Sequence, residues 1–192
     1  MWHKKVSIAL SAGSLAALSA LAFAVPTEAA RQGAQRIKIN DDCNPASFNQ
    51  FLGSPDACVK KNGKTTIEAF IAELQATQKV AAWNFKPSML KIKEGRPVIL
   101  DNRGGETHTF TMVDHFGGGF VQFLNAPSGN PVPAEECVTH GAGGLLPKPP
   151  SPVNVFVSAG AREAFDTAHL MPGTYLFQCC IHPWMRVVLT VK

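Results

Sequence analysis

Three side chains with metal-binding chemistry stand close together near the C-terminus: Cys179, His182 and Met185. They occupy every third position, and the first of them lies at the end of a segment, residues 174–180, whose alternation predicts a short strand. A thiolate, an imidazole and a thioether are soft or borderline ligands, and a thioether suits copper while offering little to zinc, calcium or magnesium. The spacing therefore predicts a loop that wraps one soft metal ion.

The alternation of that strand separates two adjacent cysteines. Tyr175, Phe177 and Cys179 point to one face, which the aromatic rings mark as the core side, whereas Cys180 points to the other face. Cys179 is therefore the ligand candidate. A centre in which two cysteines bridge a pair of copper ions is disfavoured, because the two thiols do not share a side.

The fourth ligand has to come from elsewhere in the chain, and His108 is the best candidate. The segment 107–113 alternates strictly and places His108 on the same face as Phe110 and Met112. Together with the three loop residues, His108 completes a set of two histidines and one cysteine with a weak methionine. Such a set is typical of copper sites that transfer electrons.

Other interpretations of the same residues stay open. Zinc held by the cysteine and the two histidines is one, although it would leave Met185 without a role, and simple packing of these side chains in a core is another. His115 and His140 are expected to be exposed loop residues, or else a second, looser metal site with Cys137. His169 is expected at the surface of a turn.

The chain shows a series of family motifs from residue 80 onward. In order they are Trp83-Asn-Phe85, Glu94-Gly95, Val98, Asn102, His108-Thr-Phe110 and Pro172-Gly-Thr-Tyr175-Leu-Phe177-Gln-Cys179-x-x-His182-Pro183-x-Met185. This pattern closely resembles the cupredoxins, the type 1 blue copper proteins, and is most similar to their short-loop amicyanin and plastocyanin-like group. Four features depart from that group. Arg186-Val187 directly follows the methionine, where a glycine is usual soon after it, and Cys180 lies beside the ligand cysteine. The helical segment before residue 80 and the 125–152 insertion are additions.

The resemblance implies a ligand set and a way of working. His108, Cys179 and His182 would be the equatorial ligands of one copper ion, with Met185 as the axial ligand, and the copper would cycle between Cu(I) and Cu(II). Electrons would pass through the edge of His182, close to an apolar patch. Pro183 and Trp184 are expected to contribute to that patch.

The predicted fold class is all-β, a Greek-key β-sandwich of the cupredoxin type, over residues 80–192. Short strands punctuated by Gly and Pro are predicted at 80–85, 89–93, 97–100, 107–113, 120–124, 153–158, 174–180 and 186–192. A Pro- and Gly-rich stretch, 125–152, is predicted to be an inserted loop.

An N-terminal extension, residues 25–79, is predicted to precede the sandwich and to contain one helix. A short strand is predicted at 36–40, followed by a loop-rich stretch from residue 41 to 63. The helix is expected to begin at a capping box formed by Thr65 and Glu68, and its apolar stripe is expected to pack on the main domain.

The first 24 residues resemble a signal peptide. Lys4 and Lys5 precede an almost uncharged apolar run that closes on an Ala-x-Ala site before Val25. We therefore predict an exported protein, periplasmic or secreted, with no membrane span after cleavage; an uncleaved anchor is the alternative.

Export into an oxidising compartment predicts disulfides among the five cysteines. Cys43 and Cys58 are the preferred pair, because both bracket one loop-rich segment. Cys137 and Cys180 either pair or stay free. An odd count leaves one thiol over, which a metal-bound Cys179 would account for.

The net charge and the predicted copper site together indicate the function of the protein. Without the leader the formal net charge falls from +4 to +2, with no block of like charge, which argues against nucleic acid and against strong steering of a charged partner. The expected function is electron transfer between redox proteins, a cytochrome, dehydrogenase or oxidase, by weak transient docking, and no enzyme activity. The alternative is a periplasmic copper carrier or copper-resistance protein.

Overall fold

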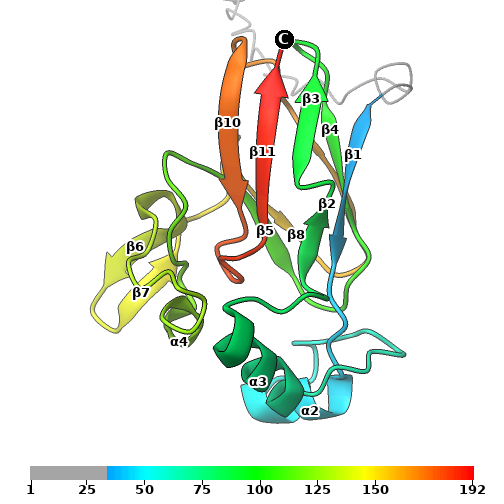
Figure 1. Ribbon diagram of the computed structural model, residues 1–192, viewed down its shortest axis with the longest axis vertical. Coiled ribbons are helices and arrows are strands. Elements are labelled where there is room, and N and C mark those ends of the chain that lie inside the picture. Colours follow the sequence, from blue (N-terminus) through cyan, green and yellow to red (C-terminus); the bar gives the residue numbers. More distant parts are fainter. Residues whose placement is uncertain (1–33) are drawn as a thin grey trace, which may run out of the picture.

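Two β-sheets pack face to face in the computed structural model, which describes residues 34–192 (Figure 1). The first sheet has the order β2 (Asn84–Lys86), β1 (Gln35–Asn40), β4 (Val98–Asn102) and β9 (Arg162–Phe165). The second has the order β3 (Met89–Ile92), β11 (Arg186–Val191), β10 (Gly173–Gln178), β5 (His108–Val113) and β8 (Asn154–Val157). The pairs β1–β4 and β3–β11 are parallel, and the other pairs are antiparallel. This architecture confirms the predicted all-β sandwich.

Aromatic contacts tie the two sheets together. Phe110 of β5 stacks on Phe177 of β10 with ring centroids 4.2 Å apart. Phe165, which β9 contributes from the other sheet, meets these two rings edge-on at 5.3 and 5.1 Å. All three side chains are fully buried. Because such rings bury a large apolar area and favour these geometries, they form the centre of the sandwich.

The N-terminal part of the chain belongs to the sandwich more closely than predicted. β1, which falls within the predicted extension of residues 25–79, is an interior strand of the first sheet and pairs with both β2 and β4. The extension also contains two helices, α2 (Pro45–Leu52) and α3 (Ile67–Thr77), where one was predicted.

Helix α2 has clear start and stop residues. The Asn44 side chain accepts a hydrogen bond from the Ser47 amide, Pro45 occupies the first turn, and Gly53 ends the helix with a left-handed φ of 66°. A proline fits the first turn because its missing N–H would have no partner there. Phe48 is the buried residue of this short helix.

Helix α3 begins one residue later than predicted. Its N-cap is Thr66, whose hydroxyl accepts a hydrogen bond from the Ala69 amide. Thr65 is not available as the cap, because its backbone is paired with the segment around Cys43. The apolar stripe is confirmed as packing: Ile67, Phe70 and Leu74 are buried.

The two helices cover the end of the sandwich at which β10 finishes, opposite the C-terminus (Figure 1). Phe48 of α2 stacks on Trp83 at 5.7 Å, and Phe70 of α3 contacts the same indole edge-on at 4.8 Å. Phe48 and Phe70 also contact each other, at 5.6 Å. This aromatic cluster fixes the helices over the loop that carries the predicted ligands.

The segment predicted as an inserted loop, 125–152, contains regular structure. It includes a 3₁₀ turn, η1 (Glu135–Cys137), and a hairpin of β6 (Val138–Gly141) and β7 (Gly144–Pro147). The strand predicted at 120–124 is wrong: a short helix, α4 (Gln122–Asn125), occupies that place. A five-residue apolar run does not distinguish a strand from a helical turn by periodicity.

The insertion has its own small core on the outer side of the second sheet. Its buried members are Val113, Ala134, Cys137, Val138 and Cys180. Covering this side buries Thr109 and Thr111 of β5, whose side chains point away from the sandwich interior. The alternation predicted for β5 is therefore present, but both of its faces are covered.

Two disulfides are formed, Cys43–Cys58 and Cys137–Cys180, and Cys179 is the free cysteine among the described residues. The preferred pairing of Cys43 with Cys58 is confirmed, and of the two possibilities left open for Cys137 and Cys180 the structure shows the bridge. The bridges span 15 and 43 residues. Loops of these sizes correspond to stabilisation of about 3 and about 4 kcal/mol if the gain comes from the unfolded chain.

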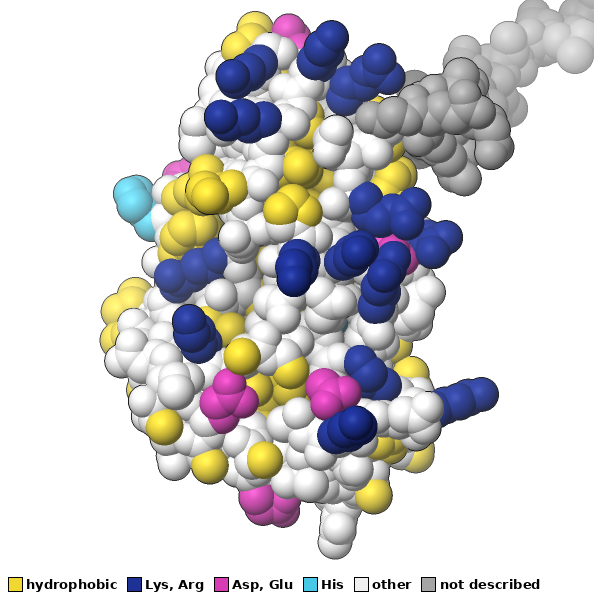
Figure 2. Space-filling view, turned by 45° about the vertical axis from the view of Figure 1, so that its right-hand side comes forward, with side chains coloured by type: hydrophobic (Ala, Val, Ile, Leu, Met, Phe, Trp, Pro, Cys, Tyr) yellow, Lys and Arg dark blue, Asp and Glu magenta, His cyan; other side chains and the backbone are white. Residues whose placement is uncertain are grey.

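Basic side chains gather on the outer face of the first sheet. Register places Lys38 beside Lys86 on one side and Asp101 on the other, with Arg162 next to Asp101. Figure 2, which brings the β1 side forward, shows dark blue Lys and Arg side chains over much of this face.

The predicted signal peptide, residues 1–24, lies outside the described residues. From residue 34 onward, no helix has both the length and the apolar character needed to cross a membrane.

Candidate metal centre

The structure brings His108, Cys179 and His182 together. Their ligand atoms all lie within 4.8 Å of one another, and the three residues are buried. The Cys179 Sγ is 3.7 Å from the Nδ1 of His108 and 3.9 Å from the Nδ1 of His182. His108 is the first residue of β5, and the other two belong to the turn that follows β10. Two neighbouring strands of one sheet therefore deliver the three donors to one point.

The turn from Cys179 to Met185 is closed by its own backbone. The Cys179 amide donates to the Met185 carbonyl at 3.0 Å, and the Met185 amide donates to the His182 carbonyl at 2.9 Å. Met185 is 1% exposed and belongs to the main core, as Cys179 does. The fourth predicted ligand thus lies in the same compact, buried turn as the two ligands that precede it.

The surroundings of the Cys179 sulfur favour its thiolate form. Burial by itself would raise the pKa of its thiol, but the hydrogen bonds and charges of His108 and His182 lower that pKa well below its ordinary value. The Thr109 amide also donates to the sulfur at 3.4 Å. A thiolate is the form of cysteine that binds a metal.

His108 is held by a buried carboxylate. Its Nε2 lies 2.9 Å from Oδ2 of Asp41, so that its Nδ1 faces the sulfur. Burial would lower the pKa of His108, but Asp41 and Cys179 together raise it to about 10. In the metal-free protein a protonated His108 therefore stabilises the fold below pH 6.5, and this contribution is lost as the pH rises toward 10.

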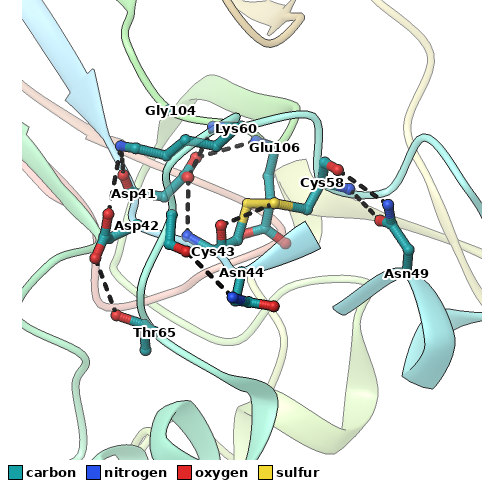
Figure 3. Close-up of a disulfide and its surroundings, with 12 residues drawn as sticks. Asp41, Asp42, Cys43, Asn44, Asn49, Cys58, Lys60, Thr65, Gly104 and Glu106 are labelled. Carbon is teal, nitrogen blue, oxygen red and sulfur yellow. Dashed lines mark hydrogen bonds and ion pairs between the residues drawn. A yellow bond between two sulfur atoms is a disulfide. The ribbon is translucent and has the colours of Figure 1, made fainter. Parts of the chain in front are cut away.

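Asp41 in turn is held by backbone amides of the turn before β5. Gly105 donates to its Oδ1 at 2.7 Å and Glu106 to its Oδ2 at 3.1 Å. The close approach requires glycine at position 104, because a Cβ there would lie 1.8 Å from the carboxylate. Cys43 lies two residues after Asp41, and its disulfide with Cys58 fixes the segment that carries Asp41 (Figure 3).

His182 has a different and looser partner. Its Nε2 lies 3.6 Å from Oε2 of Glu106, an oxygen that also accepts a hydrogen bond from the indole of Trp83 at 2.5 Å. Burial raises the pKa of Glu106, an effect that the charges of His182 and His108 reduce but do not overcome. Neither Asp41 nor Glu106 was predicted from the sequence as part of the site.

The edge of His182 is covered. The ring is 2% exposed and is surrounded by Phe70 at 6.1 Å, Trp83 at 6.3 Å and Trp184 at 5.4 Å, measured between ring centroids. The resemblance implied an apolar surface patch here, with Pro183 and Trp184 as members. Pro183 is buried and Trp184 half-buried, because helix α3 lies over this part of the turn.

The alternatives that needed further cysteines do not form. Cys180 turns away from Cys179 and forms a disulfide with Cys137. Cys137 and Cys180 therefore have no free thiol to offer a metal. His115, His140 and His169 are exposed, as predicted. Asp41 and Glu106 form a second close group with Cys43, but the Cys43 sulfur belongs to the other disulfide.

Solved structures similar to this chain include two cupredoxins, the family that the sequence resembles. A purple cupredoxin from Nitrosopumilus maritimus has 14% identity over 82% of this chain and 99% of its own, with a TM-score of 0.39. A point mutant of amicyanin, described as a reduced Cu(I) form at pH 4, has 21% identity over 59% of this chain and 78% of its own, with a TM-score of 0.33.

A third similar structure is the copper-containing nitrite reductase of Thermus scotoductus SA-01. It has 19% identity over 57% of this chain and 20% of its own, with a TM-score of 0.33. No protein-family model matches the chain, and no curated protein matches it. Because the TM-scores are below 0.5, these similarities support no conclusion about the metal centre or its function.

Proposed function

We propose that this protein is an exported, single-copper electron carrier, with His108, Cys179, His182 and Met185 as the copper ligands. One observation carries the proposal. The buried Cys179 thiol, whose pKa is lowered, and one ring nitrogen from each of His108 and His182 all lie within 4.8 Å of one another. Two histidines and a cysteine with a weak methionine are typical of electron-transfer copper sites. Zinc would use the same three donors but would give Met185 no role.

Bound there, copper would take up and release one electron by cycling between Cu(II) and Cu(I). The protein's part is to keep the ligands still. Asp41 orients the His108 ring, and the backbone hydrogen bonds between Cys179 and Met185 hold the turn. The Thr109 amide withdraws electron density from the sulfur. Contacts of this kind to the ligands tune a metal site.

Burial of the ligands favours an electron carrier over a copper carrier. None of the four ligand residues is more than 2% exposed. A carrier that hands its metal on needs ligands that a competing chelator can reach, whereas an electron carrier keeps its metal through turnover. Four protein ligands also leave no open position for a substrate, which supports electron transfer rather than catalysis.

Export and partner belong to the same proposal. Two disulfides fit an oxidising compartment, and the first 24 residues have the pattern of a signal peptide. The partner would be a redox protein that docks weakly. Its docking face would differ from the patch implied by the resemblance, because α3 covers His182.

The visible spectrum of the Cu(II)-loaded protein tests the proposal. We expect an intense thiolate-to-copper band near ~600 nm that disappears in Cys179→Ser. The double variant Cys137→Ala/Cys180→Ala is the matched control: it removes two sulfurs, one of them adjacent in sequence, and should keep the band. A wild-type protein without the band, or a Cys179→Ser variant that retains it, would contradict the proposal.

Chelator exchange separates the two uses of the metal. The copper-loaded protein should keep its copper through repeated cycles of chemical reduction and reoxidation with an excess of a Cu(I) chelator present. Rapid loss to the chelator with the blue band otherwise intact would favour the copper-carrier alternative.

A further inference from the structure

A pocket of about 270 Å³ lies beside His182, between the helical pair and helix α4. Its lining includes Phe48, Phe70, Leu124, Asp56, Glu106 and His182. At its mouth Leu52 and Phe123 are exposed by 44% and 50%. Glu106 and His182 are the deepest polar members, since both are buried.

The size and walls of the pocket fit one small ring. A cavity of about 150 Å³ lined by apolar side chains holds a benzene molecule, so this pocket has room for a ring with a substituent. Phe48 and Phe70 contribute aromatic surface to its inner wall, and Leu124 adds aliphatic surface. Small-molecule sites typically combine such walls with a few polar groups.

The polar group that faces this space is incompletely paired. Glu106 is 8% exposed, and its Oε2 accepts the Trp83 indole hydrogen. Its Oε1 accepts no hydrogen bond from any residue between 34 and 192, although Glu106 lines the pocket. This oxygen is open to solvent at the wall of the pocket, so a ligand O–H or N–H can reach it and replace water as its hydrogen-bond donor.

Charge restricts the ligand further. Glu106 at the inner end and Asp56 near the mouth are both acidic, and neither Lys nor Arg is among the lining residues. An anion would meet two carboxylates, and no Lys or Arg side chain of the lining would offset them. A neutral or cationic molecule with an O–H or N–H group meets no such penalty.

We propose that this pocket binds a small aromatic molecule that carries one hydrogen-bond donor, with its ring against Phe48 and Phe70 and its donor on Glu106. The pocket is complete in the chain without copper. The proposal therefore goes beyond electron transfer and does not depend on it, and it is tested on the copper-free protein.

Three probes of similar size separate the features of the ligand. Phenol has the ring and the donor, anisole has the ring without the donor, and benzoate has the ring with a negative charge. Titrated by calorimetry up to about 10 mM, phenol should bind about tenfold or more tightly than anisole, and benzoate should not bind. Equal affinities for phenol and anisole, binding of benzoate, or no binding of phenol would overturn the proposal.

The location is tested by filling the pocket. Ala57 lines it, whereas Ala81 is exposed outside it, so Ala57→Phe should weaken phenol binding at least about tenfold and Ala81→Phe should not. Amide shifts in the wild-type protein give a second readout that needs no variant. Phenol should move the signals of α3 and of residues 121–124, and shifts confined to other surfaces would overturn the proposal.

Discussion

The two histidines of the candidate centre are held in contrasting ways. His108 is fixed by a carboxylate 2.9 Å away that itself accepts two backbone amides and stands next to a disulfide-bonded segment. His182 has a carboxylate at 3.6 Å, a ring of aromatic neighbours and a pocket beside it. One side of the centre is a closed polar network, and the other is an aromatic wall with space behind it.

The contrast separates two tasks. The Asp41 side sets the position of one imidazole and ties it to the first sheet, because Asp41 directly follows β1. The Glu106 side connects the centre to the surface, because Glu106 and His182 both line the pocket. We therefore expect substitutions on the Asp41 side to act mainly on stability and those on the Glu106 side mainly on binding.

Replacing Asp41 should have the largest effect. Its two oxygens face the amides of Gly105 and Glu106 and the Nε2 of His108. An asparagine has one acceptor oxygen, so either orientation of its amide turns an NH₂ group toward at least one N–H donor. We expect Asp41→Asn to lower the unfolding free energy of the copper-free protein by about 3 to 5 kcal/mol in urea melts.

The neighbouring aspartate is the matched control for this variant. Asp42 carries the same charge, but its side chain is 33% exposed where it faces Lys60. Asp42→Asn should therefore change the unfolding free energy by less than about 1 kcal/mol. Equal losses from the two substitutions would show that the network around His108 has no special role.

The sequence pointed to the donor side chains that meet in the candidate centre, but not to the residues that hold them. Alternation in 174–180 and the spacing after Cys179 were enough to distinguish it from Cys180, since both are local properties of the chain. The Asp41–His108 contact joins residues 67 positions apart, and no periodicity specifies such a contact. Position 41 showed only an acidic residue after a short strand.

The errors in the fold have similar causes. Helix α2 had readable signals, Asn44-Pro45 at its start and Gly53 at its end, but it is short and lies in a segment predicted to be loop-rich. The assignment of β1 to an extension failed because its partners, β2 and β4, follow it by more than 40 residues. A strand segment with strong local alternation, β5, was placed correctly.

Acid titration should separate the two carboxylates. Burial raises the pKa of Asp41, but His108 and the amides of Gly105 and Glu106 lower it from 3.8 to about 2. Because the folded pKa is the lower one, this group stabilises the protein above pH 3.8, and the contribution is lost as the pH falls toward 2. The expected loss is about 2 to 3 kcal/mol, measured by urea melts across this range.

Glu106 should respond to pH in the opposite way from Asp41. The pKa of Glu106 is raised by burial, so its ionisation opposes folding and its contribution to stability falls as the pH rises. Asp41→Asn should flatten the acid slope, whereas Glu106→Gln should leave it in place. An acid slope that survives in Asp41→Asn would mean that another carboxylate produces it.

Replacing Glu106 should have the smallest effect on stability. A glutamine keeps an oxygen for the Trp83 indole, and its loss of charge removes a carboxylate whose ionisation burial disfavours. We expect Glu106→Gln to change the unfolding free energy by no more than about 1 kcal/mol in the urea melts, as Glu163→Gln on the exposed strand β9 should. A loss as large as that of Asp41→Asn would mean that both histidines are held equally firmly. The contrast between the two sides would then not exist.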